Sequence, residues 1–137
     1  MNYYADVILP LPIQGTFTYE LTKKEYNLLG TGYRVAVSFG KRKVYTGVIK
    51  NIHNDKPKLY ETKPIEFIYD KDEFVSALQL DFWSWVSKYY FTPIGDVLKA
   101  AVPSTFLLES DTVIIKKEIN KSDIDVMSDD EYLIYEA

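Results

Sequence analysis

The sequence predicts an α+β domain that is mainly β: a small, five- to six-stranded, barrel-like sheet with a long helix packed across it and a short second helix. Residues 1–69 contain five runs rich in β-branched and aromatic residues, separated by Pro, Gly and polar turns. After residue 72 the apolar residues recur with a helical period instead. A chain of 137 residues with 47% hydrophobic content is long enough for one domain with its own core.

The five runs predict five short strands. Pro and Gly residues between the first two mark a loop, and the polar, Pro-containing segment Asn54–Glu61 marks another before the fifth. The third and fourth runs flank Gly40, so we expect a hairpin with a basic tip. Short strands divided by turns favour a partly closed barrel. The predicted strands are Tyr3–Leu9, Thr16–Leu21, Tyr33–Phe39, Val44–Ile52 and Lys63–Tyr69.

Two helices are predicted after the strands. Asp72 is the expected N-cap of the first, and an apolar stripe along it is expected to face the core, with Trp83 off that stripe. Pro93 is expected to start the second helix, where its missing N–H costs nothing, and Pro103 to end it. The stripe consists of Phe74, Leu78, Phe82, Trp85, Val86 and Tyr89.

The C-terminal part of the chain differs from what precedes it. Glu109–Glu118 is expected to form a short β-run and Asn120–Met127 a polar linker, and Ser128 begins a capping-box pattern typical of a helix start. We therefore predict one domain over residues 1–105. Residues 106–137 would be a linker and the truncated start of a further domain, as part of a longer protein.

Composition excludes several classes of site. The chain has no cysteine and a single histidine, His53, so neither a disulfide framework nor a thiolate or polyhistidine metal site is expected. Its apolar run near the N-terminus is too short and too Pro-interrupted to span a bilayer, and it lacks the features of a signal peptide. We expect a cytoplasmic protein without a membrane partner.

No catalytic arrangement of residues appears either, because the sequence lacks a phosphate-binding Gly-rich loop and a Ser/His/Asp set. Carboxylate pairs such as Asp72/Glu73 and Asp129/Asp130 fall at predicted helix starts, where the helix dipole accounts for them. The chain itself is therefore predicted to be a binding module and not an enzyme.

The charge distribution indicates what it binds. The net charge is −4, but residues 1–65 hold 10 Lys/Arg against 5 Asp/Glu. Within this basic half, Lys41, Arg42 and Lys43 follow Gly40 at the predicted hairpin tip, where they are placed to contact phosphates. An ordinary solvated turn is the alternative interpretation. Phe17 and Tyr45 are candidates for base stacking, although Phe17 could equally be a core residue of its strand.

Several short motifs, taken together, resemble a known family. They are Ala5-Asp6-Val7, Gly15-Thr16-Phe17-Thr18-Tyr19, Arg34-Val35-Ala36-Val37-Ser38-Phe39-Gly40-Lys41, and Tyr89-Tyr90-Phe91-Thr92-Pro93-Ile94-Gly95-Asp96-Val97-Leu98 followed by Ala100-Ala101-Val102-Pro103. In this order and spacing, over about the first 105 residues, they resemble the N-terminal domain of the primosomal protein N′ family, the PriA replication-restart DNA helicases.

The resemblance implies a function and a site. This domain would recognise the 3′ end of the nascent leading strand at stalled or branched replication forks. The positions that match the family's end-binding pocket are Phe17, Thr18, Gly40 and Lys63. Thr18 departs from the family pattern, which usually carries Asp there. Either the threonine hydroxyl makes the contact to the 3′-OH, or Glu20, two residues along the same strand face, supplies the carboxylate.

The resemblance also implies that residues 106–137 are a linker and the truncated start of a winged-helix domain. For the parent protein, it implies an ATP-dependent 3′→5′ DNA helicase of primosome assembly, with ATP and zinc bound outside this chain, and a location at the bacterial nucleoid. Implied partners are branched or single-stranded DNA with a free 3′ end, single-strand-binding protein and primosome proteins. Two alternatives remain open from the sequence. One is an RNA-binding accessory module of a tRNA-modifying enzyme, and the other is a protein-interaction domain.

Overall fold

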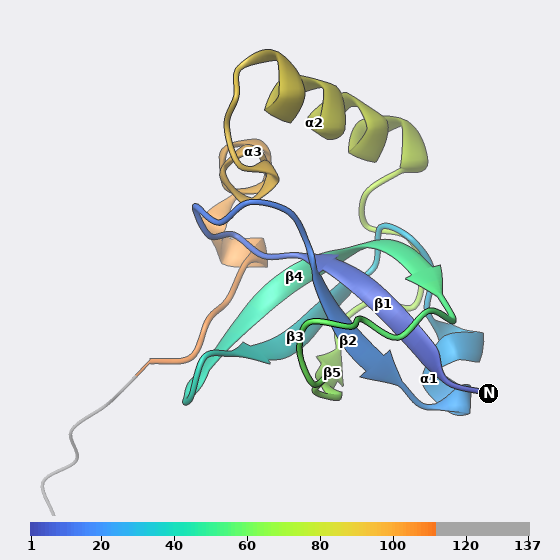
Figure 1. Ribbon diagram of the computed structural model, residues 1–137. Helices are drawn as coiled ribbons and strands as arrows, with labels where there is room; N and C mark the ends of the chain where they lie inside the picture. The colour runs from blue at the N-terminus through green and yellow to red at the C-terminus, as the bar shows by residue number, and fades with distance from the viewer. Residues whose placement is uncertain (112–137) are drawn as a thin grey trace, which may run out of the picture.

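The structure is a computed structural model that describes residues 1–111. It confirms the predicted fold class: a curled, five-stranded antiparallel sheet with helices packed alongside it (Figure 1). The strands are β1 Tyr3–Ile8, β2 Phe17–Leu21, β3 Arg34–Phe39, β4 Lys43–His53 and β5 Ile65–Ile68. The helices are α1 Lys23–Leu28, α2 Ala77–Tyr89 and α3 Ile94–Ala101, with a 3₁₀ turn η1 at Ser104–Phe106.

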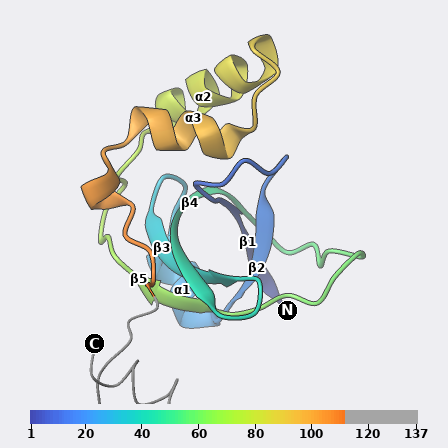
Figure 2. The same ribbon diagram turned by 90° about the vertical axis from the view of Figure 1, so that its left-hand side faces the viewer.

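The sheet curls because its central strand β4 is long. β4 pairs with β3 through its first half and with β1 through its second half, giving the order β2-β1-β4-β3-β5. The two edge strands then approach each other. The backbone N–H of Glu20 in β2 donates to the carbonyl of Lys63 at 2.9 Å, and Glu20 forms an isolated bridge with Pro64 just before β5. Figure 2 shows the ring of strands that results.

The inside of the curled sheet forms one hydrophobic core. In β3, Val35 and Val37 are fully buried on this inner face. Leu29, just beyond the C-terminal end of α1, also packs into this core. The complete cluster of buried residues is Ala5, Val7, Leu9, Tyr19, Leu21, Leu29, Val35, Val37, Ile49 and Ile65.

A second core lies on the outer face of the sheet, beneath α2 and α3. Ile8 of β1 and Val48 of β4 contact it from the sheet, and Leu98 of α3 is fully buried in it. Helix α3 lies very close to the loop after β1, because a Cβ on Gly95 would overlap the carbonyl oxygens of Leu9 and Leu11. Only glycine permits this approach, which gives a packing reason for the glycine in the Tyr89–Leu98 motif.

The predicted apolar stripe is wrong for four of its six residues, whereas Phe74 and Val86 do pack against the second core. Leu78 is 79% exposed and Tyr89 62% exposed, and Phe82 and Trp85 are also exposed, whereas Leu80 and Trp83 are buried. Trp83, placed off the stripe in the prediction, thus faces the core. The helix carries two rows of apolar residues, and α2 packs against its neighbours on one side only. Periodicity identifies such rows but does not say which one meets the rest of the protein.

Helix starts account for two further differences. Helix α2 is capped by Ser76, whose side chain accepts from the N–H of Gln79, so the predicted N-cap Asp72 is wrong. The prediction also missed the short helix α1. Its N-cap Thr22 forms a full capping box with Glu25, and this Thr-x-x-Glu spacing was available in the sequence as a signal.

The segment after α3 returns to the sheet. The carbonyl of Leu108 accepts from both the N–H and the hydroxyl of Thr46, and the N–H of Ser110 donates to the carbonyl of Val44. The predicted β-run at 109–118 is described only at its start, where Glu109 bridges to Tyr45. The predicted linker at 120–127 and the helix start at Ser128 lie outside the described residues.

Within residues 1–111, no helix is both long enough and apolar enough to cross a membrane.

Candidate nucleic-acid interface

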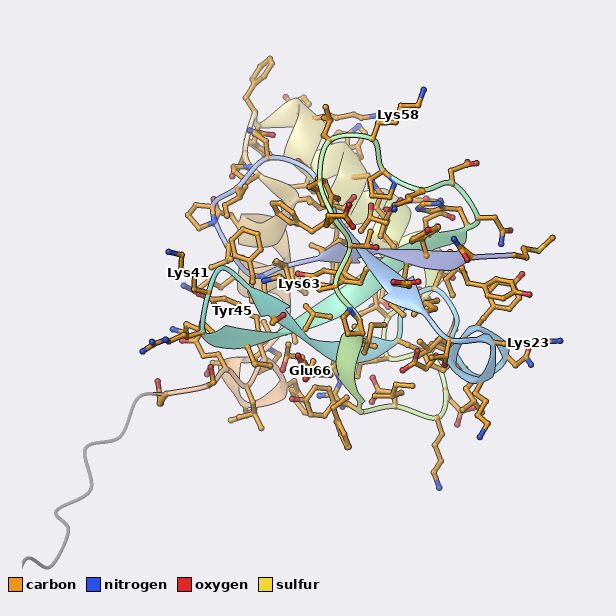
Figure 3. The ribbon with its side chains drawn as sticks, turned by 60° about the horizontal axis from the view of Figure 1, so that its bottom comes forward. Lys23, Lys41, Tyr45, Lys58, Lys63 and Glu66 are labelled. Atoms are coloured by element: carbon orange, nitrogen blue, oxygen red, sulfur yellow. The ribbon has the colours of Figure 1, made fainter. Side chains whose placement is uncertain are left out.

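The turn between β3 and β4 depends on its glycine. Gly40 adopts a φ of 73°, in the left-handed region that side-chain-bearing residues rarely occupy. Its carbonyl accepts from the ammonium of Lys63 at 2.8 Å, although the two residues are 23 positions apart in the chain. Figure 3 shows Lys63 beside the hairpin that carries Lys41 and Tyr45. This contact brings the loop before β5 against the hairpin.

A pocket of about 330 Å³ opens where that loop, the hairpin and the edge of β2 meet, within the range of small-ligand sites. The four residues that the family resemblance selected, from three separate parts of the chain, all line it. The lining residues are Phe17, Thr18, Tyr19, Ser38, Phe39, Gly40, Tyr60, Glu61 and Lys63. The structure therefore brings together every predicted end-binding residue in a single concave site.

The aromatic part of the pocket is partly fixed by packing. Phe17 and Phe39 pack edge to face with ring centroids 4.7 Å apart, and both are only half-buried, so part of each ring stays available to a ligand. Tyr19 donates its hydroxyl to the carbonyl of Ser38 at 2.8 Å. Burial, with a smaller contribution from Tyr60, raises the pKa of Tyr19 to about 12, so this phenol remains a donor at neutral pH.

Thr18 makes two hydrogen bonds at the pocket edge. Its backbone N–H donates to the hydroxyl of Tyr60 at 2.9 Å, and its own hydroxyl donates to Asp6 Oδ1 at 2.7 Å. Asp6 lies directly opposite Thr18 in the β1–β2 ladder. The alternative acid Glu20 is exposed and does not line the pocket. A carboxylate is thus in contact with Thr18, but it comes from the neighbouring strand.

Asp6 is held by a second partner. His53 Nε2 lies 3.0 Å from Asp6 Oδ1, the same oxygen that Thr18 contacts. The N–H of Asp55 donates to His53 Nδ1 at 3.1 Å, so Nδ1 carries a lone pair and Nε2 carries the hydrogen that Asp6 accepts. This chain of contacts fixes the Asp6 carboxylate behind Thr18.

The three cations of the hairpin tip are not equivalent. Lys41 and Arg42 are exposed. Lys43 instead forms an ion pair with Glu109 at 3.3 Å and lies over the ring of Tyr45, 5.2 Å from its centroid. The hydrogen bond to Glu109 raises the pKa of Lys43. Because Lys43 is already paired, Lys41 and Arg42 are the hairpin cations best placed to contact phosphates beside the pocket. Tyr45, the second candidate for base stacking, does not line the pocket.

Comparison with known proteins agrees with this geometry. The family model of the PriA 3′DNA-binding domain (3′BD) matches residues 6–103. The chain belongs to the PriA 3′DNA-binding domain family. It is also 30% identical over 113 residues to the replication restart protein PriA of Buchnera aphidicola subsp. Acyrthosiphon pisum (strain APS). That alignment covers 82% of this chain and 15% of the relative, so the chain spans a small part of the relative's length.

Membership of the 3′DNA-binding domain family supports DNA binding in replication restart over the RNA-binding and protein-interaction alternatives. The sequence alone did not identify Asp6, Tyr60 or Glu61 as site residues. Asp6 follows from Thr18 once the β1–β2 register is known. Tyr60 lies in an irregular loop whose sequence carries no periodic signal, so its position depends on the folded structure.

Proposed function

We propose that this domain binds the 3′ terminus of a nascent leading strand at a stalled or branched replication fork, with the terminal nucleotide in the pocket. The observation that carries the proposal is the convergence of Phe17, Thr18, Gly40 and Lys63 on one pocket. A pocket closed by the loop before β5 favours a chain end, because a continuous strand would have to leave through its wall.

The residues of the pocket have complementary roles in this proposal. Phe17 and Phe39 offer aromatic surface to the terminal base, a contact worth about 1–3 kcal/mol per base in single-strand binders. The ammonium of Lys63 has three donors and uses one on Gly40. Among residues 1–111 the other two have no partner and can bind oxygens of the last nucleotide, while Lys41 and Arg42 contact phosphates of the strand leading to the pocket.

The domain would act within a longer protein, which we propose to be an ATP-dependent 3′→5′ helicase that binds ATP and zinc elsewhere. Single-strand-binding protein and primosome proteins are proposed partners of that longer protein. The support for this step is the similarity to the replication restart protein PriA of Buchnera.

The test compares one forked DNA carrying a recessed 3′-OH with the same fork carrying a 3′-phosphate. We expect the 137-residue chain to bind the 3′-OH fork more tightly, and Lys63→Met to weaken binding to that fork by about 5- to 150-fold, equivalent to about 1–3 kcal/mol. Lys23→Met, a change of exposed charge on α1, is the matched control. Equal binding to both forks by the unaltered chain would refute end recognition.

A further inference from the structure

Thr18 presents an unusual set of hydrogen-bonding groups to the pocket. A threonine has two hydrogens to donate, on its backbone nitrogen and on its hydroxyl. Here the first is bound by the hydroxyl of Tyr60 and the second by Asp6. What remains on the residue's side chain is a lone pair on Oγ1, which can only accept.

Asp6 sets the direction of the Thr18 hydroxyl. An ionised carboxylate can only accept, so the hydrogen between Thr18 and Asp6 must come from the threonine. The Nε2–H of His53 donates to the same carboxylate oxygen and keeps Asp6 in place. The hydroxyl of Thr18 therefore cannot turn its hydrogen toward the pocket without losing a charge-assisted bond.

We propose that Asp6 and Tyr60 are positioning residues that make Thr18 an acceptor-only contact, and that this contact selects a terminal hydroxyl because a hydroxyl can donate. This inference rests on the proposed function, since it concerns how the same pocket distinguishes chain ends. It also assigns the carboxylate missing at position 18 to Asp6 on the adjacent strand, acting through the threonine oxygen.

The selection follows from donor and acceptor matching. A free 3′-OH donates to Thr18 Oγ1, whose acceptor strength is increased by its own bond to a carboxylate. A 3′-fluoro end has similar size and no charge but has no hydrogen to donate. A 3′-phosphate is also acceptor-only and carries a charge of about −1.5 to −2 at neutral pH. Both modified ends therefore place an acceptor against the Thr18 lone pair.

The decisive measurement is the ratio of dissociation constants for 3′-fluoro and 3′-OH ends of one forked DNA, determined with the 137-residue chain. Loss of a hydrogen bond to a polarised acceptor predicts about 10-fold weaker binding of the 3′-fluoro end. The fluoro probe removes the donor without adding charge, so repulsion cannot account for the difference.

Three variants test the roles of the residues. Thr18→Val keeps the shape and removes the acceptor, so the ratio should fall to about 1. Asp6→Asn should lower the ratio severalfold, because the neutral amide oxygen that replaces the carboxylate oxygen holds the threonine hydrogen less tightly, so that this hydrogen can turn toward fluorine. Tyr60→Phe should lower it as well, since it frees the backbone N–H of Thr18 as a donor. Glu20→Gln, which removes the same charge as Asp6→Asn from an exposed position, should leave the ratio unchanged.

The outcomes separate this inference from the function on which it rests. If the unaltered chain prefers a 3′-OH over a 3′-phosphate but Thr18→Val and Asp6→Asn keep the full fluoro ratio, the inference is wrong and end recognition stands. If Glu61→Gln alone abolishes the ratio, the pocket-lining Glu61 is the acceptor and the inference is again wrong. If the unaltered chain distinguishes no ends, both proposals fail.

Discussion

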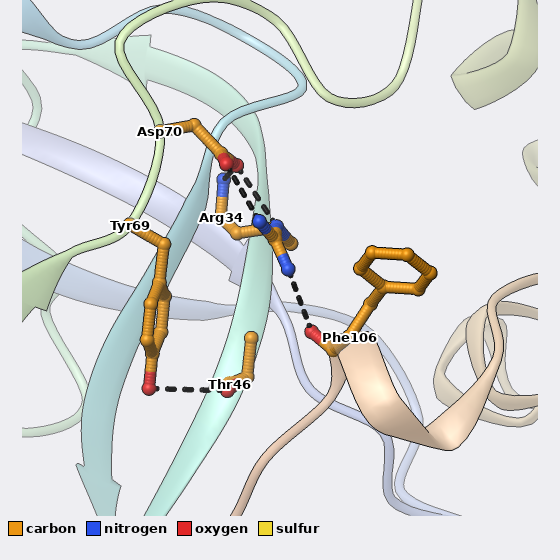
Figure 4. A network of polar contacts seen from close by, with 5 residues as sticks. All are labelled: Arg34, Thr46, Tyr69, Asp70 and Phe106. Atoms are coloured by element: carbon orange, nitrogen blue, oxygen red, sulfur yellow. Dashed lines mark hydrogen bonds and ion pairs between the residues drawn. The ribbon is translucent and has the colours of Figure 1, made fainter.

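Arg34→Met tests how much the contacts of Arg34, which hold the segment after α3 against the sheet, contribute to the stability of the domain. The guanidinium of Arg34 donates twice to Asp70, at 2.7 and 3.0 Å, and once to the carbonyl of Phe106 at 3.1 Å (Figure 4). Its central carbon also lies 4.2 Å from the centroid of the Phe74 ring. One side chain of β3 thus joins the loop after β5, the approach to α2 and the η1 turn.

The expected loss of stability follows from the burial of the ion pair. The side chains of Arg34 and Asp70 are only 18% and 14% exposed. Breaking a buried pair by removing one partner costs about 3–5 kcal/mol, and the residual solvent access here reduces that to about 2–3 kcal/mol. For a domain of about 100 residues this corresponds to a fall in melting temperature of about 10–20 °C.

Thermal unfolding followed by circular dichroism measures this change. Lys50→Met is the matched control, because Lys50 is an exposed residue of the neighbouring strand β4, and it should shift the melting temperature little. The double variant Arg34→Met/Asp70→Asn should lose less than the two single variants combined, since each single change already breaks the same pair. A fall below about 3 °C for Arg34→Met would refute the assigned role of the pair.

The same pair has a pH signature. Burial opposes the charge of Asp70, but its hydrogen bonds with Arg34 and the charge of Arg34 outweigh burial and lower the pKa of Asp70. A carboxyl whose pKa is lower in the folded state adds stability at pH values above its unfolded pKa, about 3.9, and loses it as pH falls through the folded pKa. Arg34→Met should therefore flatten the acid side of the stability profile.

Three further predictions concern the hairpin, α3 and the domain boundary. Changing both Lys41 and Arg42 to Ala should flatten the dependence of the logarithm of the DNA-binding constant on the logarithm of the salt concentration. The slope should change by about 0.7–0.9 units for each phosphate that is no longer neutralised. Lys43→Ala should change the slope less, because Glu109 already neutralises Lys43. An equal change of slope in Lys43→Ala would refute the proposal that Lys41 and Arg42 are the main phosphate contacts of the hairpin. Gly95→Ala should destabilise the domain by at least about 1–3 kcal/mol, measured by urea unfolding, because its Cβ would overlap two carbonyls. Ending the chain after residue 105 should lower the melting temperature more than ending it after residue 111, because the shorter chain lacks the hydrogen bonds between Leu108 and β4. Equal melting temperatures would place the domain boundary at residue 105, as predicted from the sequence.

The strands were predictable because each carries its own local pattern. Alternation in β3 and the turn residues around it fix the hairpin to within a residue, and all five predicted strands occur. The exposed stripe of α2 was not predictable in the same way. Its two apolar rows are similar in sequence, and the choice between them depends on where α3 and the outer face of the sheet lie. That arrangement is tertiary information.

The candidate site also contains residues that local patterns identified and residues that depend on tertiary contacts. Phe17, Thr18, Gly40 and Lys63 were found through short motifs that resemble a family, and the φ of Gly40 follows from its residue type. Asp6 could not be identified from the sequence, because its contact with the site is a hydrogen bond to Thr18, a cross-strand partner 12 residues away. Tyr60 could not be identified because it lines the pocket from an irregular loop. Contacts between distant segments thus place these two residues at the candidate site, and local sequence patterns do not encode such contacts.

The pocket exists because the barrel closes incompletely. If β2 and β5 formed a continuous ladder, the outward N–H of Thr18 would pair with a backbone carbonyl and strand backbone would fill the space. Instead Glu20 meets the backbone before β5, and the hydroxyl of Tyr60 satisfies Thr18. These two contacts protect the edge of β2 from pairing with another chain. They also leave an opening, lined by half-buried aromatic rings and the ammonium of Lys63, at a seam where a strand end could enter without disturbing either core.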